Sequence, residues 1–454
     1  MGIVNVKVSV ILPSLNVARY IRECMDSVLS QSLQELEIIC VDAESVDGTR
    51  ELLNEYAGKD SRITVLNSNV KSYGKQVNIG LEYASGEYIA ILETDDWIAK
   101  DMYQSLYKCV SEDHLDYAAA DFDIFYELQS GSCYFNRQYL FWGEQREWYG
   151  KILDSDQIAA LRSDDYVLWK GIYNREFLNV NHIRLHESFG AAFQDMGFLQ
   201  QVKTYAKRAK YIDESFYRYR QDREGVSSKG IEGLKYYENE FLWINDKLKL
   251  PVLLKGVHKK YYYYTMSISF ITKYEQILIS LNGNWQDKRL SESYLWFQEQ
   301  LVKAVRGGIL DETMYAVALR ERLRLLLTSQ EAHAKVVMNT EKKKQDCVQL
   351  LKKITRNRPL IIFGCGVRGE KLMLFCNRNH IDMKAFCDNN VAIQGKKKFG
   401  FPIISPNDLK SEIYNKNVMV ILSMKKGAEQ VHGQLVNLGI EAHKIVNEIP
   451  EGII

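Results

Sequence analysis

The sequence lacks the cysteine patterns that mark zinc sites and disulfide frameworks. It contains eight cysteines in 454 residues, and none of them forms a CxxC pair or part of a Cys/His cluster. Scattered cysteines of this kind are typical of proteins from a reducing compartment, so we expect a cytoplasmic protein.

Long apolar runs and a strong net charge are missing as well. No window approaches the roughly 18 consecutive apolar residues that a membrane-spanning helix needs. The first residues, MGIVNVKVSVILPS, lack the apolar core of a signal peptide and predict a β-strand instead. The formal net charge of +1 gives no global field that would recruit nucleic acid, so we expect no nucleic-acid partner.

The chain is long enough for two or three domains, each with its own core. Its first part alternates segments of helical spacing with short apolar runs, which read VKVSVIL, LEIICVD, RITVLN and EYIAILE. Such alternation predicts βαβ units and a parallel sheet. We therefore expect an α/β fold with one domain over 1–230, a helical region over 231–357 and a small Rossmann-like domain over 358–454.

Local patterns predict further elements inside these ranges. Extended segments are expected at 116–128, 166–173 and 211–221, and a helix is expected over 193–209. In the helical region, Pro251 and Asn282-Gly283 are expected to interrupt the helices.

Candidate ligand-binding residues stand at the ends of three predicted strands. Pro13 and Asp42 end the first two, and the fourth is followed by Glu93, Asp95 and Asp96, three carboxylates within four residues. Ligands of parallel sheets bind beyond the carboxyl ends of the strands, so we expect these residues to meet at one edge. Like charges so close together call for a cation or a bound proton.

Two explanations of the acidic segment stay open at this point. An acidic-x-acidic triplet at a strand end suits a divalent ion that takes its remaining ligands from substrate phosphates. Alternatively, Thr94, Asp95 or Asp96 caps a helix that begins at Trp97, because Asp and Thr favour N-caps.

Four motifs follow one another over about 95 residues, and they read VSVILPSLN, VDAESVDGT, YGKQVNIGL and GEYIAILETDD. In this order and spacing they resemble the family 2 glycosyltransferases of the GT-A fold. LWKGIYNREFL, AAFQDMGFLQQV and FYRYRQ are similar to later segments of that family. The resemblance implies an inverting, metal-dependent transfer of a sugar from a nucleotide sugar, by our expectation a UDP-sugar. The implied acceptor is a hydroxyl of a glycan or lipid-linked oligosaccharide, as in polysaccharide biosynthesis.

The resemblance also implies roles for individual residues. Asp195, in the pair Gln194-Asp195, matches the family's general base. Asp95, together with Glu93, matches the metal-binding triplet, and the implied ion is Mn²⁺ or Mg²⁺. The implied donor-binding residues are Pro13, Ser14, Leu15, Asp42, Glu44, Lys75, Glu93, Thr94, Asp96 and Arg220.

Three positions depart from the family pattern. Ala43 stands where the family has a second aspartate that commonly contacts the nucleotide base, so Asp42 or Glu44 is expected to substitute. Glu93 replaces an aspartate and keeps its charge. Gln194 replaces a glutamate, which leaves one carboxylate fewer beside Asp195.

Three cationic assignments stay open. Lys75 could neutralise phosphate charge or be an exposed helix lysine. Either Arg218 or Arg220 could face the diphosphate, and both could equally be solvated strand arginines.

The C-terminal range has a glycine motif and a basic stretch. GCGVRG, residues 364–369, fits GxGxxG, and Asp388 lies 19 residues past Gly369, as in dinucleotide-binding folds. A structural or regulatory role is the alternative to bound NAD. Residues 335–358 carry eight basic and two acidic side chains, a balance of +6, which suits either peripheral contact with the inner face of the plasma membrane or a solvated helix. The sequence is compatible with a homo-oligomer.

Two rival functions belong to other classes. A nucleotidylyltransferase would carry a glycine-rich loop after the first strand, whereas this chain has PSLNVARY there. A catalytically silent scaffold would have no need of Glu93, Asp95 and Asp195.

Overall fold

The chain divides into two compact units. The computed structural model describes residues 5–128, 130–141, 143–161, 167–221, 230–356, 358–411, 418–447 and 449. One unit comprises Met1–Phe125 and Asn136–Ala334, and the other comprises Tyr126–Phe135 and Lys335–Ile454. These units differ from the three predicted ranges, because the helices up to Ala334 share a unit with the first sheet. Tyr166 and Asn357, at the edges of predicted segments, lie outside the described residues.

The first unit is built on a mixed sheet with ten described strands. All seven residues of β1 are buried, as expected for a strand covered on both faces. β7 (Cys133–Gln138) pairs with β6, and β8 (Ile152–Leu153) pairs with β10. The other strands lie in the order β3 (Ile63–Asn67), β2 (Leu36–Asp42), β1 (Val8–Ser14), β4 (Tyr88–Ile91), β9 (Gly171–Asn174), β6 (Tyr117–Glu127), β10 (Ala209–Arg220) and β5 (Trp97–Ile98).

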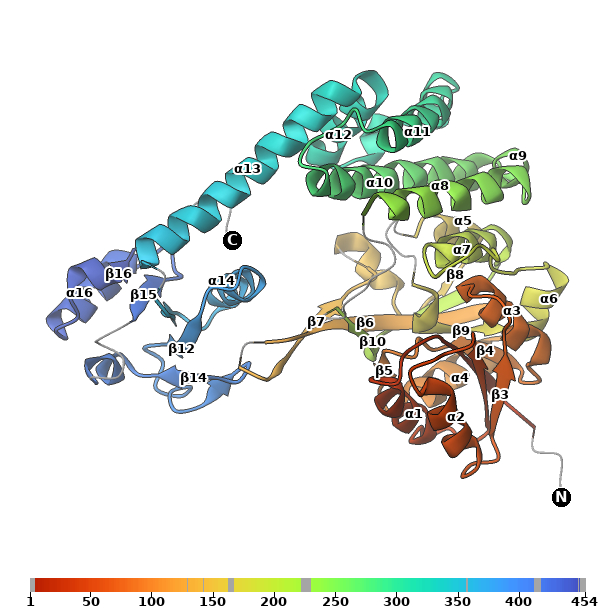
Figure 1. Cartoon of the computed structure of the whole chain (residues 1–454), viewed down its shortest axis with the longest axis horizontal. Coiled ribbons are helices and arrows are strands. Elements are labelled where there is room, and N and C mark those ends of the chain that lie inside the picture. The colour runs from red at the N-terminus through yellow and green to blue at the C-terminus, as the bar shows by residue number, and fades with distance from the viewer. Residues whose placement is uncertain are drawn as a thin grey trace. The chain divides into compact units, whose positions relative to one another are not determined.

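Helices cover both faces of this sheet, and a further helical layer packs on them (Figure 1). The helices of the α/β part are α1 (Ile21–Leu29), α2 (Thr49–Ala57), α3 (Tyr73–Tyr83), α4 (Met102–Asp113), α5 (Ser155–Ala159), α6 (Arg175–Val180) and α7 (Gln194–Tyr205). In the further layer, α8 contacts α7, and α10 contacts α5. The layer consists of α8 (Gly230–Asp246), α9 (Leu250–Leu253), α10 (Gly256–Ser280), α11 (Lys288–Arg306) and α12 (Val317–Thr328).

Two helix boundaries differ from the predicted ones because of strand pairing. The helix expected from Trp97 begins at Met102, and Trp97–Ile98 instead pairs with β10 as β5. Asp101 is its N-cap residue, so the capping explanation of Thr94, Asp95 and Asp96 is wrong. The helix expected over 193–209 ends at Tyr205, since the chain enters β10 at Ala209.

Both breaks predicted in the helical region are confirmed. Asn282 and Gly283 follow α10 with φ of 52° and 81°. At the other break α8 ends at Asp246 and α9 begins at Leu250, so the helical run is interrupted just before Pro251. Pro251 itself lies in the first turn of α9, where no intrahelical bond needs its missing N–H.

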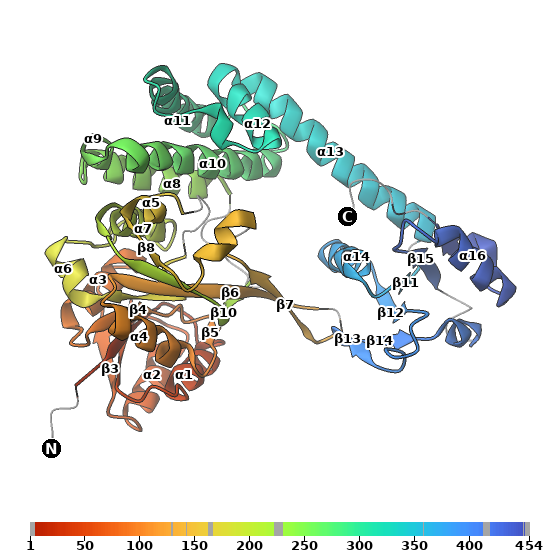
Figure 2. The same ribbon diagram turned by 180° about the vertical axis from the view of Figure 1, so that it is seen from behind.

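The second unit contains a smaller sheet (Figure 2). The described strands lie in the order β13 (Lys397–Lys398), β14 (Phe401–Ile404), β12 (Met383–Cys387), β11 (Leu360–Phe363), β15 (Met419–Leu422) and β16 (Ile445–Val446). Its helices include α14 (Val367–Arg378), α16 (Ala428–Asn437) and, from Lys335 on, α13 (Gln330–Thr355). Leu128 and Tyr134, from the β6–β7 hairpin, belong to its core.

Candidate functional site

The predicted strand ends meet at one edge of the first sheet. The parallel register of β1 and β2 pairs Ser14 with Asp42. The hydroxyl of Thr94 donates a hydrogen bond to the carbonyl of Pro13 at 3.0 Å, which joins the acidic segment to β1. The side-chain amide of Gln76, on α3, donates to the carbonyl of Ser14 at 2.8 Å. The convergence expected from the sequence is therefore confirmed.

Two tyrosines hold the outer carboxylates of the acidic segment. The hydroxyl of Tyr73 donates to Glu93 Oε1 at 2.5 Å, and the hydroxyl of Tyr217 donates to Asp96 Oδ2 at 2.8 Å. Burial, and next the charge of Asp95, raise the pKa of Asp96 well above its ordinary value. The hydrogen bonds that Asp96 accepts from the Tyr217 hydroxyl and from the backbone amide of Arg220 oppose this shift.

Arg220 provides a cation at the acidic segment. Its Nε donates to the carbonyl of Asp95 at 3.1 Å, and its Nη2 lies 2.6 Å from Glu23 Oε2. Arg218 pairs instead with Asp123, at 2.6 Å. Of the two arginines that the sequence left open, Arg220 is the one that contacts the acidic segment.

The turn after β2 has one buried and one exposed carboxylate. Asp42 is fully buried, and its Oδ2 accepts from the backbone amide of Ser45 at 3.2 Å. Its Oδ1 has no hydrogen-bond partner among the described residues. Glu44 is exposed, with a left-handed backbone at φ 59°. In the family pattern a second aspartate stands at the position of Ala43. In this chain Asp42, one residue earlier, keeps an acceptor atom at the same strand end.

Two other predicted donor residues have less specific surroundings. Leu15 is half-buried directly after β1. Lys75 Nζ lies 3.3 Å from Glu187 Oε1, so its charge is paired within the protein. A phosphate contact by Lys75 stays a prediction.

Asp195 lies in the first turn of α7 and is partly exposed. Burial among protein atoms raises its pKa from 3.8 to about 7, the amide of Met196 opposes this shift, and the charge of Glu240 adds to it. A carboxyl group with a pKa near neutrality suits general base catalysis. Burial, then Glu93 and more weakly Asp195, raise the pKa of Tyr73, so Asp195 and the acidic segment act on the same side chain.

Gln194 ties the loop before α7 to the helix. Its Nε2 donates to Ser188 Oγ at 2.9 Å, and its Oε1 accepts from the amide of Ala192 at 2.7 Å. The N-cap residue is Phe193, without a capping side chain, and the hydrogen bond found for Asp195 Oδ1 among the described residues comes from the next amide, that of Met196, at 2.9 Å. Asp195 therefore does not cap α7 in the usual way.

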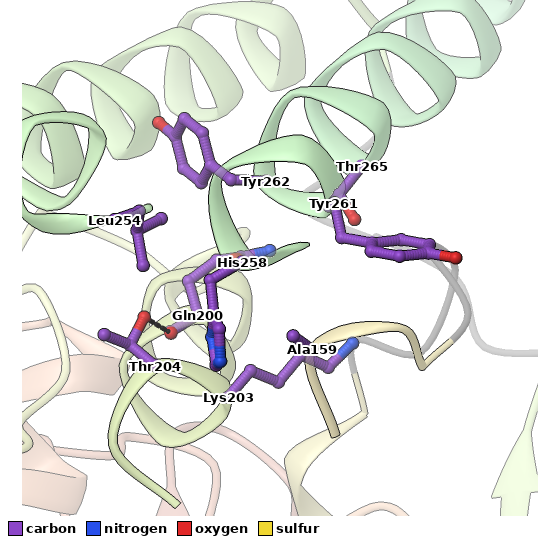
Figure 3. Close-up of a pocket in the computed structure, with 9 residues that line it drawn as sticks. All are labelled: Ala159, Gln200, Lys203, Thr204, Leu254, His258, Tyr261, Tyr262 and Thr265. Atoms are coloured by element: carbon purple, nitrogen blue, oxygen red, sulfur yellow. Dashed lines mark hydrogen bonds between the residues drawn. The ribbon is translucent and has the colours of Figure 1, made fainter. Parts of the chain in front are cut away.

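A small cavity lies between α5, α7 and α10, and none of the predicted site residues lines it (Figure 3). Its volume is about 10 Å³, which is room for a single water molecule. Its lining includes Gln200, whose carbonyl accepts from Thr204 Oγ1 at 2.7 Å. The cavity is too small for a nucleotide sugar.

No group of three or more metal-binding side chains occurs among the described residues. Asp95 and Glu93 are adjacent in the acidic segment, and one Glu93 oxygen is engaged by Tyr73. This donor set fits an ion such as Mg²⁺, which binds to one or two carboxylates and completes its coordination with waters and substrate phosphates.

The glycine motif of the second unit forms the turn expected of it. Gly364 has φ 102°, and a Cβ on Gly369 would lie 2.0 Å from the carbonyl oxygen of Gly364. The carboxylate expected to face a ribose, that of Asp388, accepts instead from the amide of Cys365 at 2.8 Å. Asp388 thus holds the glycine turn itself, and a bound dinucleotide stays a prediction.

Membrane contact also stays a prediction. The described helices include none that combines the length and the apolar character required to cross a bilayer. Within the basic stretch, Lys342, Lys343 and Lys344 are exposed on α13.

Sequence reasoning missed three residues of this region, namely Tyr73, Tyr217 and Glu240. The tyrosines carry no recognisable spacing signal. Glu240 stands three residues after Tyr237, on the buried face of α8. A charged residue on the apolar face of a predicted helix could have marked Glu240 as a candidate site residue.

Comparison with known proteins finds two matching family models. Residues 9–160 match "Glycosyl transferase family 2", and residues 356–446 match "C2185-like, N-terminal". Glycosyltransferase GlyA of Streptococcus pneumoniae is 28% identical over 226 residues, which cover 48% of this chain and 31% of that protein. This chain thus spans about a third of the length of that relative.

Two further similarities extend over more of the chain. The cholesterol galactosyltransferase of Borreliella burgdorferi is 25% identical over 311 residues, which cover 67% of this chain and 83% of that protein. The crystal structure of S. aureus TarS 1-349 in complex with UDP-GlcNAc matches with a TM-score of 0.52 and 21% identity, covering 74% of this chain and 92% of that one. The predicted fold class, an α/β chain with a GT-A domain, a helical middle and a second sheet, is confirmed.

Proposed function

We propose that this chain is an inverting family 2 glycosyltransferase that moves a sugar from a nucleotide sugar to an acceptor hydroxyl. The match of residues 9–160 to that family supports the reaction class. The observation that carries the proposal is the common neighbourhood of Asp195 and Glu93 around Tyr73, since it brings a base of pKa about 7 to the acidic strand end.

The residues divide the work between the donor and the acceptor. Asp195 takes the proton from the acceptor hydroxyl as that oxygen attacks the anomeric carbon from the face opposite the leaving group, and the configuration inverts. Arg220 offers a guanidinium beside Asp95, where the diphosphate is expected. Asp42 Oδ1 is the acceptor atom that suits an N–H of the nucleotide base.

A divalent ion completes the proposed donor site. Asp95, with Glu93, would hold Mn²⁺ or Mg²⁺ together with the donor phosphates. Bound there, the ion supplies Lewis-acid stabilisation of the charge that grows on the leaving diphosphate.

The proposed donor is a UDP-sugar, because the structurally similar TarS binds UDP-GlcNAc. The proposed acceptor is a glycan or a lipid-linked oligosaccharide, and a lipid acceptor is consistent with the similarity to a cholesterol galactosyltransferase. The exposed lysines of α13 suit peripheral contact with an anionic membrane face in the cytoplasm.

A panel of nucleotide sugars tests the function. The full chain is incubated with each donor, Mn²⁺ and candidate acceptors, and release of nucleoside diphosphate is measured against the Asp195→Asn variant. We expect release for at least one donor, with loss of release in the variant. A chain that releases no diphosphate from any donor behaves as a scaffold, and the proposal is then wrong.

A further inference from the structure

We propose that Glu240 of α8 is a positioning residue for Asp195, supplying from the helical layer the second carboxylate that Gln194-Asp195 lacks. The inference rests on the proposed function, which makes Asp195 the base. It gives the helical layer a part in catalysis.

The carboxylate of Glu240 is buried against the first turns of α7. Glu240 is 1% exposed, and its Oε2 lies 2.9 Å from His186 Nδ1. The backbone amide of Gly197 also acts on this carboxylate and lowers its pKa. A Cβ built on Gly197, two residues after Asp195, would lie 1.9 Å from Glu240 Oε1. The carboxylate therefore fits against α7 only because residue 197 has no side chain.

Gly197 is an unfavourable residue for the helix in which it lies. A glycine in a helix interior costs about 1 kcal/mol relative to alanine. The same Cβ would also lie 3.0 Å from Trp243 Cζ3, so α8 approaches α7 here with two side chains. A local rule broken at a close contact of this kind points to a functional reason.

The turn before Asp195 is held by the same helical layer. Phe193 has a left-handed backbone at φ 69°, which is strained for a bulky residue. Its ring packs on Tyr237 of α8, with centroids 5.3 Å apart, and Lys273 Nζ of α10 lies 4.9 Å from its centroid. Two helices thus keep the turn in a conformation that it would not adopt alone.

The charge of Glu240 acts on Asp195 in the direction that a base requires. Burial contributes most to the raised pKa of Asp195, and the charge of Glu240 adds to it. Burial also raises the pKa of Glu240, while its hydrogen bond to His186 opposes that shift. The titratable and charged groups around Asp195 are Tyr73 of α3, Tyr173 of β9, Tyr219 of β10, Glu240 of α8 and, over the neighbouring ring of Phe193, Lys273 of α10.

His186 connects this carboxylate to solvent. Its ring stacks on Trp243, with centroids 4.9 Å apart and an interplanar angle of 3°. Both side chains line a cavity of about 480 Å³, so this end of the pair reaches solvent. The hydrogen bond and the charge of His186 lower the pKa of Glu240 and favour its ionised form, and ionised Glu240 in turn makes Asp195 a stronger base.

Glu240→Gln tests this inference in the full chain, because it removes the charge and keeps the shape. Two readouts are measured for the variant: the pH dependence of kcat, and the titration of Asp195 by ¹³C NMR on aspartate-labelled protein. The Asp195 resonance is the one that disappears in Asp195→Asn. Glu238→Gln is the matched control, since Glu238 lies on the same helix but bonds to Ser293 of α11.

We expect the titration of Asp195 and the acidic limb of kcat to move to lower pH in Glu240→Gln. The expected shift is at least about half a pH unit, a threefold change in proton affinity. Donor affinity should stay unchanged, and Glu238→Gln should leave both midpoints in place. Unmoved midpoints in Glu240→Gln would overturn the inference.

A second variant tests the inference if Glu240→Gln does not fold. His186→Phe keeps an aromatic ring on Trp243 and removes the nitrogen that contacts Glu240, so Glu240 takes up a proton more readily and the midpoint of Asp195 should move in the same direction. No movement in a folded His186→Phe protein counts against the inference. A wild-type chain without transferase activity would refute the proposed function instead, while the NMR titration still decides the role of Glu240.

Discussion

The hydroxyl of Tyr73 donates a 2.5 Å hydrogen bond to Glu93 Oε1 from the first residue of α3. Ser72 fixes this end of the helix, because its Oγ accepts from the amide of Lys75 at 3.2 Å. Since the charge of Asp195 also raises the pKa of Tyr73, one tyrosine couples the two parts of the proposed site. Its substitution should therefore affect both stability and donor binding.

Tyr73→Phe should destabilise the fold by about 1.5–3 kcal/mol, the usual contribution of a hydrogen bond to a charged group. Urea denaturation of the variant and the wild type measures this change. The control is Tyr83→Phe at the other end of α3, where the side chain is 49% exposed. Equal denaturation midpoints for Tyr73→Phe and the wild type would mean that the bond contributes nothing.

Donor binding should require a divalent ion, because the carboxylates of Glu93 and Asp95 would otherwise repel the diphosphate. Calorimetric titration of UDP with Mn²⁺, and again after addition of EDTA, measures the requirement. We expect binding to weaken at least tenfold in EDTA, and Asp95→Asn to bind equally weakly under both conditions. Equal affinity of the wild type with and without EDTA would exclude the proposed metal role.

Arg220→Lys should weaken UDP binding, because lysine cannot reproduce the planar contacts that the guanidinium makes beside Asp95. Arg218→Lys is the matched control on the same strand, since Arg218 is engaged by Asp123. The same calorimetric titration compares the two variants. Similar losses in both would show that the effect comes from β10 as a whole rather than from the diphosphate site.

The sequence was sufficient to predict which residues meet at the sheet edge, because the features that determine this edge are local. β1 and β2 are short β-branched runs, and parallel pairing brings their carboxyl ends together, so the approach of Pro13 and Asp42 follows from topology. The start of α4 was mispredicted because Trp97 pairs with Arg218, a residue far away in the sequence. Helical spacing alone cannot reveal such a strand.

The contacts around Asp195 were not predictable for the same physical reason. Glu240 meets His186 and Gly197 only after α8 packs on α7, and no pattern in one segment specifies that packing. The pairing of β6 with β7 is similar, since only the first strand lay in a segment predicted as extended, 116–128, and the place of Leu128 and Tyr134 in the second core was not predicted.

The part of the second unit that follows Arg356 should be dispensable for transfer to a soluble acceptor analogue, because the proposed catalytic residues all lie before residue 241. A chain that ends at Arg356 keeps α8 and α13, but it exposes Leu128 and Tyr134, whose partners are removed. Replacing both with serine prevents aggregation at the hairpin. Activity is compared with that of the full chain after circular dichroism confirms folding, and a folded but inactive product would contradict the prediction.

Asp195→Asn and Asp95→Ala should fail in different ways. Asparagine keeps the size of Asp195 but cannot accept the proton, so donor affinity should hold while turnover falls by about 10² to 10⁴. Asp95→Ala should instead weaken donor binding itself. A donor titration and a rate measurement on each variant distinguish the two, and near-normal turnover of Asp195→Asn would remove Asp195 from the mechanism.

The same substitution of Asp195 should stabilise the fold, in a manner that depends on pH. The pKa of Asp195 rises from 3.8 to about 7 in the folded protein, mainly through burial, so the folded state holds this proton more tightly than the unfolded chain. Ionisation therefore costs stability progressively as pH rises from about 4 to about 7, and asparagine escapes this cost. We expect the Tm of Asp195→Asn to exceed that of the wild type clearly at pH 8 and by less at pH 5. A Tm difference that is the same at both pH values would show that the carboxyl of Asp195 is not perturbed, and its proposed role as a base at neutral pH would then lose its electrostatic support.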